Sequence, residues 1–140
     1  MCLYTKQVNP RVLAKDKIFY KVLYKLDDDY YTPFAKSRVY LNRSIRANGD
    51  IDFVRKDKYC VTHNLLFGGY IHLWRKKQDA EKAADLITIH LLREEPIQFE
   101  VVVVRAIVRA GALYYNGFCD LVESGSSNAV AVNMVTYELL

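Results

Sequence analysis

The sequence predicts an α+β fold, in which a mixed or antiparallel sheet accompanies one principal helix at about residues 77–92. Segments rich in β-branched and aromatic residues lie on both sides of a single stretch with helical periodicity. The segment 97–108 has an apolar middle on both faces, which is typical of a central strand covered on both sides. One helix among several strands, without regular alternation of the two, is typical of the α+β class.

The chain of 140 residues is expected to form a single domain, residues 1–140. Residues 1–16 are polar, contain a proline and show no periodicity. We therefore expect this first segment to be an arm that is at best partly ordered.

The front half is expected to consist of short strands separated by turns. The first clear strand is 17–25 (KIFYKVLYK), whose flanking lysines are expected to be solvated, and an acidic turn follows at 27–29. A second strand is expected near 37–43, and a short strand pair at 51–62 after an Asn-Gly-Asp turn. Two glycines precede the third confident strand, 70–74.

The helix is predicted by one apolar stripe with the spacing i, i+3, i+4, i+7 and i+11. The stripe consists of Ala80, Ala83, Ala84, Ile87 and Leu91. Pro96 forbids continuation, so the helix should end by about residue 93. Its alanines imply a close approach to a sheet. Further strands are expected at 97–108, 112–118 and 129–140, with a flexible polar loop at 123–128.

Candidate ligand-binding residues gather where the strand 70–74 leads into the helix. Strand alternation places Tyr70, His72 and Trp74 on one face. If the aliphatic face of this strand meets the helix, the Tyr-His-Trp face has the chemistry to stack a base or a nicotinamide ring. The alternative is a second small core that contains a hydrogen-bonded histidine.

Three basic residues, Arg75, Lys76 and Lys77, follow directly at the start of the helix. Cations next to free backbone N–H groups can hold an anion, although they oppose the helix dipole. The alternative is a solvated linker. The predicted ligand-binding residues are therefore Tyr70, His72, Trp74, Arg75 and Lys76.

The sequence lacks the motifs of several common kinds of metal, nucleotide and catalytic site. The single Cys-x-x-His pair, Cys60 and His63, is half of what a structural zinc site usually takes, so we expect no metal site. The acidic run 27–29 lacks the alternating ligands and the glycine of a calcium loop. No phosphate-binding glycine loop and no Gly-x-Ser-x-Gly motif occurs. We accordingly predict no cofactor and assign no catalytic residue.

The net charge of +4 is unevenly distributed along the chain. Residues 1–60 hold 13 Lys and Arg against 7 Asp and Glu, whereas no Lys or Arg occurs after residue 109. A nucleic-acid-binding module would gather this charge on one face, with Arg38, Arg43 and Arg46 together. Plain solubility explains the same excess.

The cysteines and the hydropathy indicate a cytoplasmic protein without a membrane segment. Three cysteines without close spacing do not form a disulfide framework and fit a reducing compartment. No early apolar run has the character of a signal peptide, and the longest aliphatic run, 101–104, is too short to span a bilayer.

The chain resembles a group of small uncharacterised proteins from bacteria and their phages. The matching pieces are CLYT (2–5), YKVL (20–23), GYIH (69–72) followed by a helix with DAEKA, and VRAGALYYNG (108–117) followed by NAVAVNMVTY. The resemblance implies a bacterial or mobile-element origin and carries no function with it.

The chain is more distantly similar to ADP-ribosyltransferase-like folds. On that plan Tyr24, His72 and either Glu100 or Glu138 take the positions of the site residues. The sequence departs from the plan because it has no Ser-Thr-Ser-type strand and no Glu-x-Glu motif.

The function that the sequence favours is that of a non-enzymatic binding or accessory protein, whose partner is another protein or a second copy of the chain. The first alternative is an ADP-ribosyltransferase-like enzyme that uses NAD, or a degenerate relative of one. The second is a nucleic-acid-binding module built on the basic front half.

Overall fold

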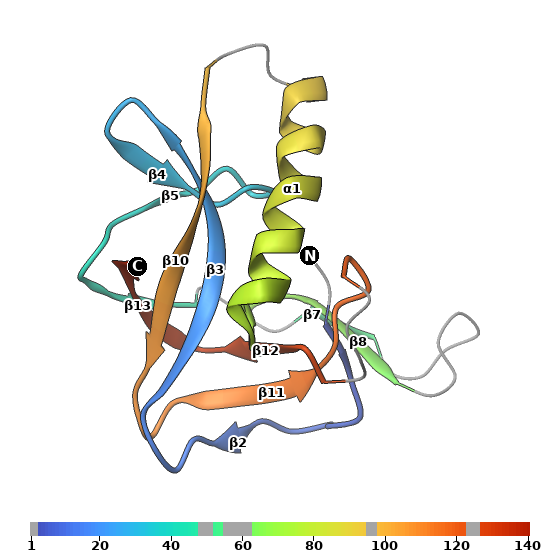
Figure 1. Ribbon diagram of the computed structural model, residues 1–140. Coiled ribbons are helices and arrows are strands. Elements are labelled where there is room, and N and C mark those ends of the chain that lie inside the picture. The colour runs from blue at the N-terminus through green and yellow to red at the C-terminus, as the bar shows by residue number, and fades with distance from the viewer. Residues whose placement is uncertain (1–2, 48–51, 55–62, 95–97, 123–126) are drawn as a thin grey trace.

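The computed structural model describes residues 3–47, 52–54, 63–94, 98–122 and 127–140 (Figure 1). Of these residues, 49% lie in strands and 15% in a helix, and every strand pairing is antiparallel. The predicted α+β class was therefore wrong. The fold is an antiparallel β structure that carries one helix, because the front half forms more strands than its weak sequence pattern indicates.

The larger sheet contains strands from the whole length of the chain. Its order is β2 (Arg11–Val12), β11 (Leu113–Gly117), β12 (Ala129–Val132), β9 (Ile71–Trp74), β3 (Lys17–Leu26), β10 (Glu100–Val108), β13 (Met134–Leu139) and β6 (Ser44–Arg46). β4 (Asp29–Tyr31) pairs with β3, and β5 (Arg38–Val39) pairs with β4. A smaller sheet has the order β1 (Leu3–Thr5), β8 (Asn64–Gly68) and β7 (Asp52–Val54). In Figure 1, β11, β12 and β2 run at a steep angle to the long strands β3 and β10.

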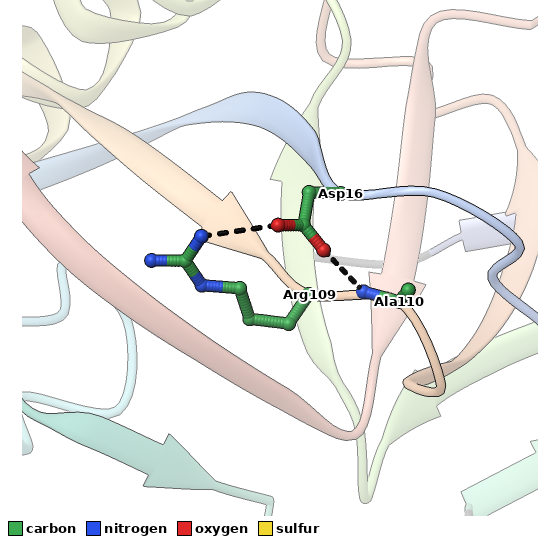
Figure 2. Close-up of polar contacts among 3 residues, drawn as sticks. All are labelled: Asp16, Arg109 and Ala110. Atoms are coloured by element: carbon green, nitrogen blue, oxygen red, sulfur yellow. Dashed lines mark hydrogen bonds and ion pairs between the residues drawn. The ribbon is translucent and has the colours of Figure 1, made fainter.

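The strands β3 and β10 form the centre of the molecule. They pair over nine residue positions, from Lys25 opposite Glu100 to Lys17 opposite Val108. The end of this ladder is fixed by Asp16, which precedes β3 (Figure 2). Its carboxylate accepts hydrogen bonds from the Arg109 guanidinium at 3.1 Å and from the Ala110 backbone N–H at 2.8 Å. The Ala110 hydrogen bond, and after it the Arg109 hydrogen bond, lowers the pKa of Asp16, because both stabilise the charged form.

The single helix, α1 (Lys77–Glu94), lies alongside β3 and β10 (Figure 1). The helix lies where its apolar stripe predicts it, and it ends before Pro96. Ala80 and Ala83 are fully buried, so the backbone of α1 approaches the sheet closely. Together with Ile87 and Leu91 they pack in one core with Trp74. A second core contains Phe19, Leu23 and Val104 from the opposite face of β3 and β10.

The first segment of the chain is built into the fold, although its sequence predicts a loosely ordered arm. β1 pairs with β8, β2 pairs with β11, and Leu3 is fully buried. Tyr4 and Phe118 exchange backbone hydrogen bonds of 2.8 and 3.0 Å. A Cβ atom at Gly117 would lie 1.9 Å from the Tyr4 carbonyl oxygen, so this approach requires glycine.

Three further elements differ from their predicted form. The expected strand 129–140 is divided at Asn133 into β12 and β13, which pair with different neighbours. β8 has no counterpart in the prediction. Of the pair expected at 51–62, β7 is described, whereas residues 55–62 lie outside the described residues, as do 123–126 of the predicted polar loop.

Candidate functional site

The candidate site is a cavity that opens where β3 separates from β9. Along the described part of these strands, Tyr20 and Trp74 are their single paired position. The His72 carbonyl oxygen, two residues before this pair, accepts a hydrogen bond of 2.9 Å from the Lys21 ammonium. A side-chain donor of β3 thus satisfies a carbonyl that a continuing ladder would pair with backbone.

The cavity has a volume of about 440 Å³, is partly open to solvent, and is lined by segments from six parts of the chain. They are β3, the β4–β5 region, β6, the Gly68-Gly69 turn, β9 and β13. Its apolar lining includes Val39, Ile45 and Ile71, which also contact the second core. A cavity of this size with a largely apolar lining and a few polar groups is typical of small-molecule sites.

Three cationic side chains line the cavity: Lys21, Arg38 and Arg46. No aspartate or glutamate occurs among its described lining residues. Arg38 forms an ion pair of 2.7 Å with Asp29, and both of these side chains are substantially exposed. The cavity therefore carries a local excess of positive charge.

Lys21 has no counter-ion among the described residues. Its side chain is partly buried, and its one described hydrogen bond goes to the neutral His72 carbonyl. Burial lowers the pKa of Lys21 to about 8, because desolvation disfavours the ammonium form. At pH 7 the side chain is still mainly protonated, and two of its three N–H donors remain available.

Tyr137 supplies a hydroxyl group to the same cavity. Its side chain is 1% exposed, and burial raises its pKa, so the phenol is neutral at physiological pH. Within the described chain the hydroxyl has no hydrogen-bond partner. No fully buried side-chain oxygen of the described residues lacks a partner, so this hydroxyl reaches open space and has capacity for a ligand or a water molecule.

His72, one of the predicted residues, lines the cavity as a neutral group. Its Nε2 atom lies 3.2 Å from the Leu66 carbonyl oxygen and donates to it, since a carbonyl can only accept. Burial, and after it the charge of Lys21, lowers the pKa of His72 to about 4. The imidazole is consequently uncharged at pH 7.

Tyr70 also lines the cavity, whereas Trp74 lies outside it. The Tyr70 ring packs on Tyr115, with 5.6 Å between the ring centroids, and burial raises the pKa of Tyr70. Trp74 is 1% exposed and packs in the core beneath α1.

Arg75 and Lys76 do not line the cavity either. The Arg75 guanidinium donates two hydrogen bonds, of 3.0 and 2.6 Å, to the Asn116 side-chain oxygen, and it lies over the Phe19 ring. Lys76 is exposed just before α1. The first turn of α1 contains the buried Asp79, whose carboxylate is favoured at the positive end of the helix dipole.

Arg38 and Arg46 were named from the sequence only as part of a nucleic-acid-binding face, and Lys21 and Tyr137 were not named as site residues. Only Lys21 left a readable signal, because it stands between Phe19 and Leu23 on one face of a strand. A lysine at such a position interrupts an apolar face. The other residues reach the cavity through strand pairings that the sequence does not specify.

Of the residues of the ADP-ribosyltransferase-like plan, Tyr24 and Glu100 belong to adjacent pairs of the β3–β10 ladder, and strand alternation puts them on opposite faces of the sheet. Tyr24 stacks on Tyr31, with 5.3 Å between the ring centroids, and Glu138 forms an ion pair of 3.2 Å with Arg105. Glu100 stands opposite Lys25 at one end of the β3–β10 ladder. Neither glutamate belongs to the described lining of the cavity.

The described residues contain no group of three or more His, Cys, Asp or Glu side chains that could hold a metal ion. Cys60 of the Cys-x-x-His pair lies outside the described residues, and the His63 ring packs edge-on against Phe118 at 5.2 Å. Cys119 is buried.

No helix in the described part of the chain combines the length and the apolar character needed to cross a membrane. Comparison with protein-family models, with curated proteins and with solved structures gave no match to this chain. The resemblance to small bacterial and phage proteins accordingly stays a prediction, and the cavity itself has to carry the functional argument.

Proposed function

We propose that the protein is a non-enzymatic binding protein that holds a small anionic ligand in the cavity between β3 and β9. One observation carries this proposal: Lys21 is a partly buried cation without a counter-ion among the described residues, in a cavity of about 440 Å³. Lysine is seldom buried unless it is paired. A bound anion would supply the missing partner.

The remaining lining supports an anion over a cation. Arg38 and Arg46 add positive charge, and the described lining adds no carboxylate to balance it. A cavity with one sign of charge and low-dielectric walls concentrates ligands of the opposite sign.

The chemistry of the lining supports binding over catalysis. General acid–base and nucleophilic catalysis use carboxylates, thiols, imidazoles or amines that exchange protons near neutral pH, usually beside a second such group. Lys21, whose pKa burial lowers to about 8, is the group of this kind in the described lining, and its hydrogen bond goes to a backbone carbonyl oxygen. The described lining has no carboxylate and no cysteine. His72 donates to Leu66, and burial lowers the pKa of its imidazole to about 4, which is far from a working catalytic range.

The test is calorimetric titration of the protein with small anions, among them acetate, phosphate and citrate. We expect at least one anion to bind to the wild type and to bind at least tenfold more weakly to Lys21→Met, since a charged hydrogen bond contributes about 1.5–3 kcal/mol. Lys6→Met is the matched control, because Lys6 is exposed and does not line this cavity. Equal affinities for wild type and Lys21→Met would exclude this cavity as the anion site.

The NAD-using alternative is tested on the same samples. An enzyme of that class predicts a rise in melting temperature with saturating NAD. Our proposal predicts that any rise in melting temperature with NAD is lost in at least one of the variants Tyr137→Phe and Lys21→Met. A rise that is independent of both residues would favour a nucleotide site elsewhere in the chain.

Nucleic-acid binding is a second candidate, favoured by the arrangement of three arginines. The guanidinium carbons of Arg38 and Arg43 lie 4.9 and 5.0 Å from the centroid of the exposed Tyr40 ring. Arg46 lines the cavity together with Arg38, so the three cations lie in one region. Binding of single-stranded oligonucleotides that weakens steeply with added salt and is lost in Arg43→Ala would support this candidate. An absence of binding at low salt would remove it.

A further inference from the structure

The chemical class of the ligand follows from how the polar and apolar groups of the cavity are distributed. Lys21 and Tyr137 come from strands on either side of β10. In the register, Lys21 stands opposite Val104, whereas Tyr137 stands opposite Ala106. Val104 and Ala106 both belong to the second core, and paired residues share a face. The ammonium and the phenol therefore lie on the same side of the sheet, above one strand.

We propose that the ligand is a monocarboxylate with an apolar body. Its carboxylate accepts hydrogen bonds from the Lys21 ammonium and the Tyr137 hydroxyl, and its body packs against Val39, Ile45 and Ile71. This inference rests on the proposed function of the cavity and adds the identity of the charged group.

The charge of the inner lining matches a single negative charge. Lys21 is partly buried, whereas the Arg38 side chain is 49% exposed and already pairs with Asp29. Arg46 is exposed. His72 adds no charge at pH 7, because burial lowers its pKa to about 4. A dianion at Lys21 would keep one charge without a close partner in a poorly hydrated site, which is costly.

The donors at this position also match a carboxylate. A carboxylate has two oxygens and no hydrogen to donate, so it needs donors only. Lys21 offers two free N–H groups, and the Tyr137 hydroxyl has no described partner. An alcohol or an amine of the same shape would bring its own donor to a position that already has donors.

The apolar residues of the lining favour a ligand with an apolar body that packs against them. Val39, Ile45 and Ile71 come from three different segments and line the cavity together. Burial of apolar surface contributes about 25 cal/mol per Å². Acetate, which has one methyl group, therefore lacks most of the surface that this lining can cover.

The test compares three probes that share an eight-carbon body and differ in head group, which are octanoate, octyl phosphate and octanol, below the concentrations at which they form micelles. Acetate serves as the probe that has the carboxylate without the body. All four are titrated by calorimetry, and binding in the cavity is checked by two-dimensional NMR of the backbone amides around Lys21. We expect octanoate to bind at least about tenfold more tightly than each of the other three, which corresponds to about 1.4 kcal/mol.

Two variants test the proposed contacts. Lys21→Met should weaken octanoate binding at least tenfold, and Tyr137→Phe should weaken it severalfold, whereas the control Lys6→Met should not change it. Far-UV circular dichroism establishes that each variant is folded, and Tyr137→Phe keeps the inference testable should Lys21→Met fail to fold. Octanoate affinity should also fall as the pH rises through about 8, because Lys21 then loses its charge.

The outcomes separate this inference from the function on which it rests. Tighter binding of octyl phosphate that depends on Lys21 would overturn the monocarboxylate and leave an anion-binding cavity. Octanoate binding that is insensitive to both substitutions would also overturn it. If no probe and no simple anion binds in a Lys21-dependent way, both the inference and the proposed function fall.

Discussion

β3 pairs with β10 along one edge and with β9 and β4 along the other, and the pairing is continuous along the first edge only. With β10 it forms a continuous ladder of nine residue pairs, whereas with β9 it shares one pair among the described residues. The β3–β10 ladder is covered by aliphatic side chains, which we call the closed side. The edge of β3 that faces β9 borders the cavity, and we call it the open side. The contrast shows that a cavity in a sheet requires no extra domain. It arises where a ladder stops early and a side chain, here Lys21, satisfies the carbonyl that is left.

The largest effect on stability is expected at Trp74, whose pair with Tyr20 is the one that joins β3 to β9 among the described residues. Trp74 is 1% exposed and packs beneath α1, and it stands opposite Tyr20. Trp74→Ala should lower the free energy of unfolding by about 3–5 kcal/mol, because it leaves a large cavity in the core. Urea denaturation measures this change, with Trp74→Phe as a smaller truncation. A loss below 1 kcal/mol would mean that the helix-side core does not hold the two strands together.

The closed side is tested by two residues of β3 that both pair with β10. Leu23 is fully buried opposite Val102, whereas Ile18 is 51% exposed opposite Ile107. Leu23→Ala should cost about 2–5 kcal/mol of unfolding free energy. Ile18→Ala should cost about 0.5 kcal/mol or less, as is usual at the surface. Similar losses at both positions would contradict the described orientation of the strand.

Acid should lower the free energy of unfolding, because His72 is buried in its neutral form. Its pKa is lowered from 6.5 to about 4 on folding, so the unfolded chain binds a proton more readily between these values. The contribution of the neutral imidazole to the free energy of unfolding is fully present above pH 6.5 and is lost as the pH falls toward 4. Between pH 7 and pH 5 we expect a loss of about 2 kcal/mol from this group, since each pKa unit corresponds to 1.36 kcal/mol.

The control for this pH dependence is another histidine of the same chain. His72→Gln should remove that part of the acid destabilisation, because glutamine does not titrate. His90→Gln should retain it, since His90 is exposed on α1. Parallel stability curves for the wild type and His72→Gln between pH 7 and pH 5 would refute the assignment.

The smaller of the two pH effects on stability is expected from Lys21. Burial lowers its pKa from 10.5 to about 8, so the unfolded chain binds more protons between these values and the folded protein gains stability as the pH rises. Relative to Lys21→Met, the wild type should gain about 1 kcal/mol between pH 7 and pH 9. Urea denaturation at both values measures the difference. A gap that is constant with pH would show that Lys21 is well hydrated in the unliganded cavity.

The helix could be predicted because its signal is local. The apolar stripe of Ala80, Ala83 and Ile87 repeats at helical spacing, and a proline follows. The long strands 17–25 and 97–108 were predicted for the same reason, since their residues favour β structure without help from a partner. The fold class was wrong because short strands such as β1 and β8 are stabilised by the segments that they pair with.

The candidate site could be predicted only in part. Tyr70 and His72 line the cavity and were selected from strand alternation. Lys21 was included in the predicted strand 17–25 without a role of its own, although it interrupts the apolar face of Phe19 and Leu23. The cavity itself depends on where the pairing of β3 with β9 ends. That position is set by registers between distant segments, which no short sequence pattern encodes.

Asn133 determines how far the cavity can widen. It joins β12, the partner of β9, directly to β13, the partner of β10. Its backbone N–H and side-chain oxygen both bond to Leu113, and its carbonyl accepts from Ala47. The two walls are thus tethered by one peptide unit that is itself held in place. If the cavity holds the proposed ligand, this covalent link resists separation of the two walls, so we expect the width of a ligand to be restricted more than its length.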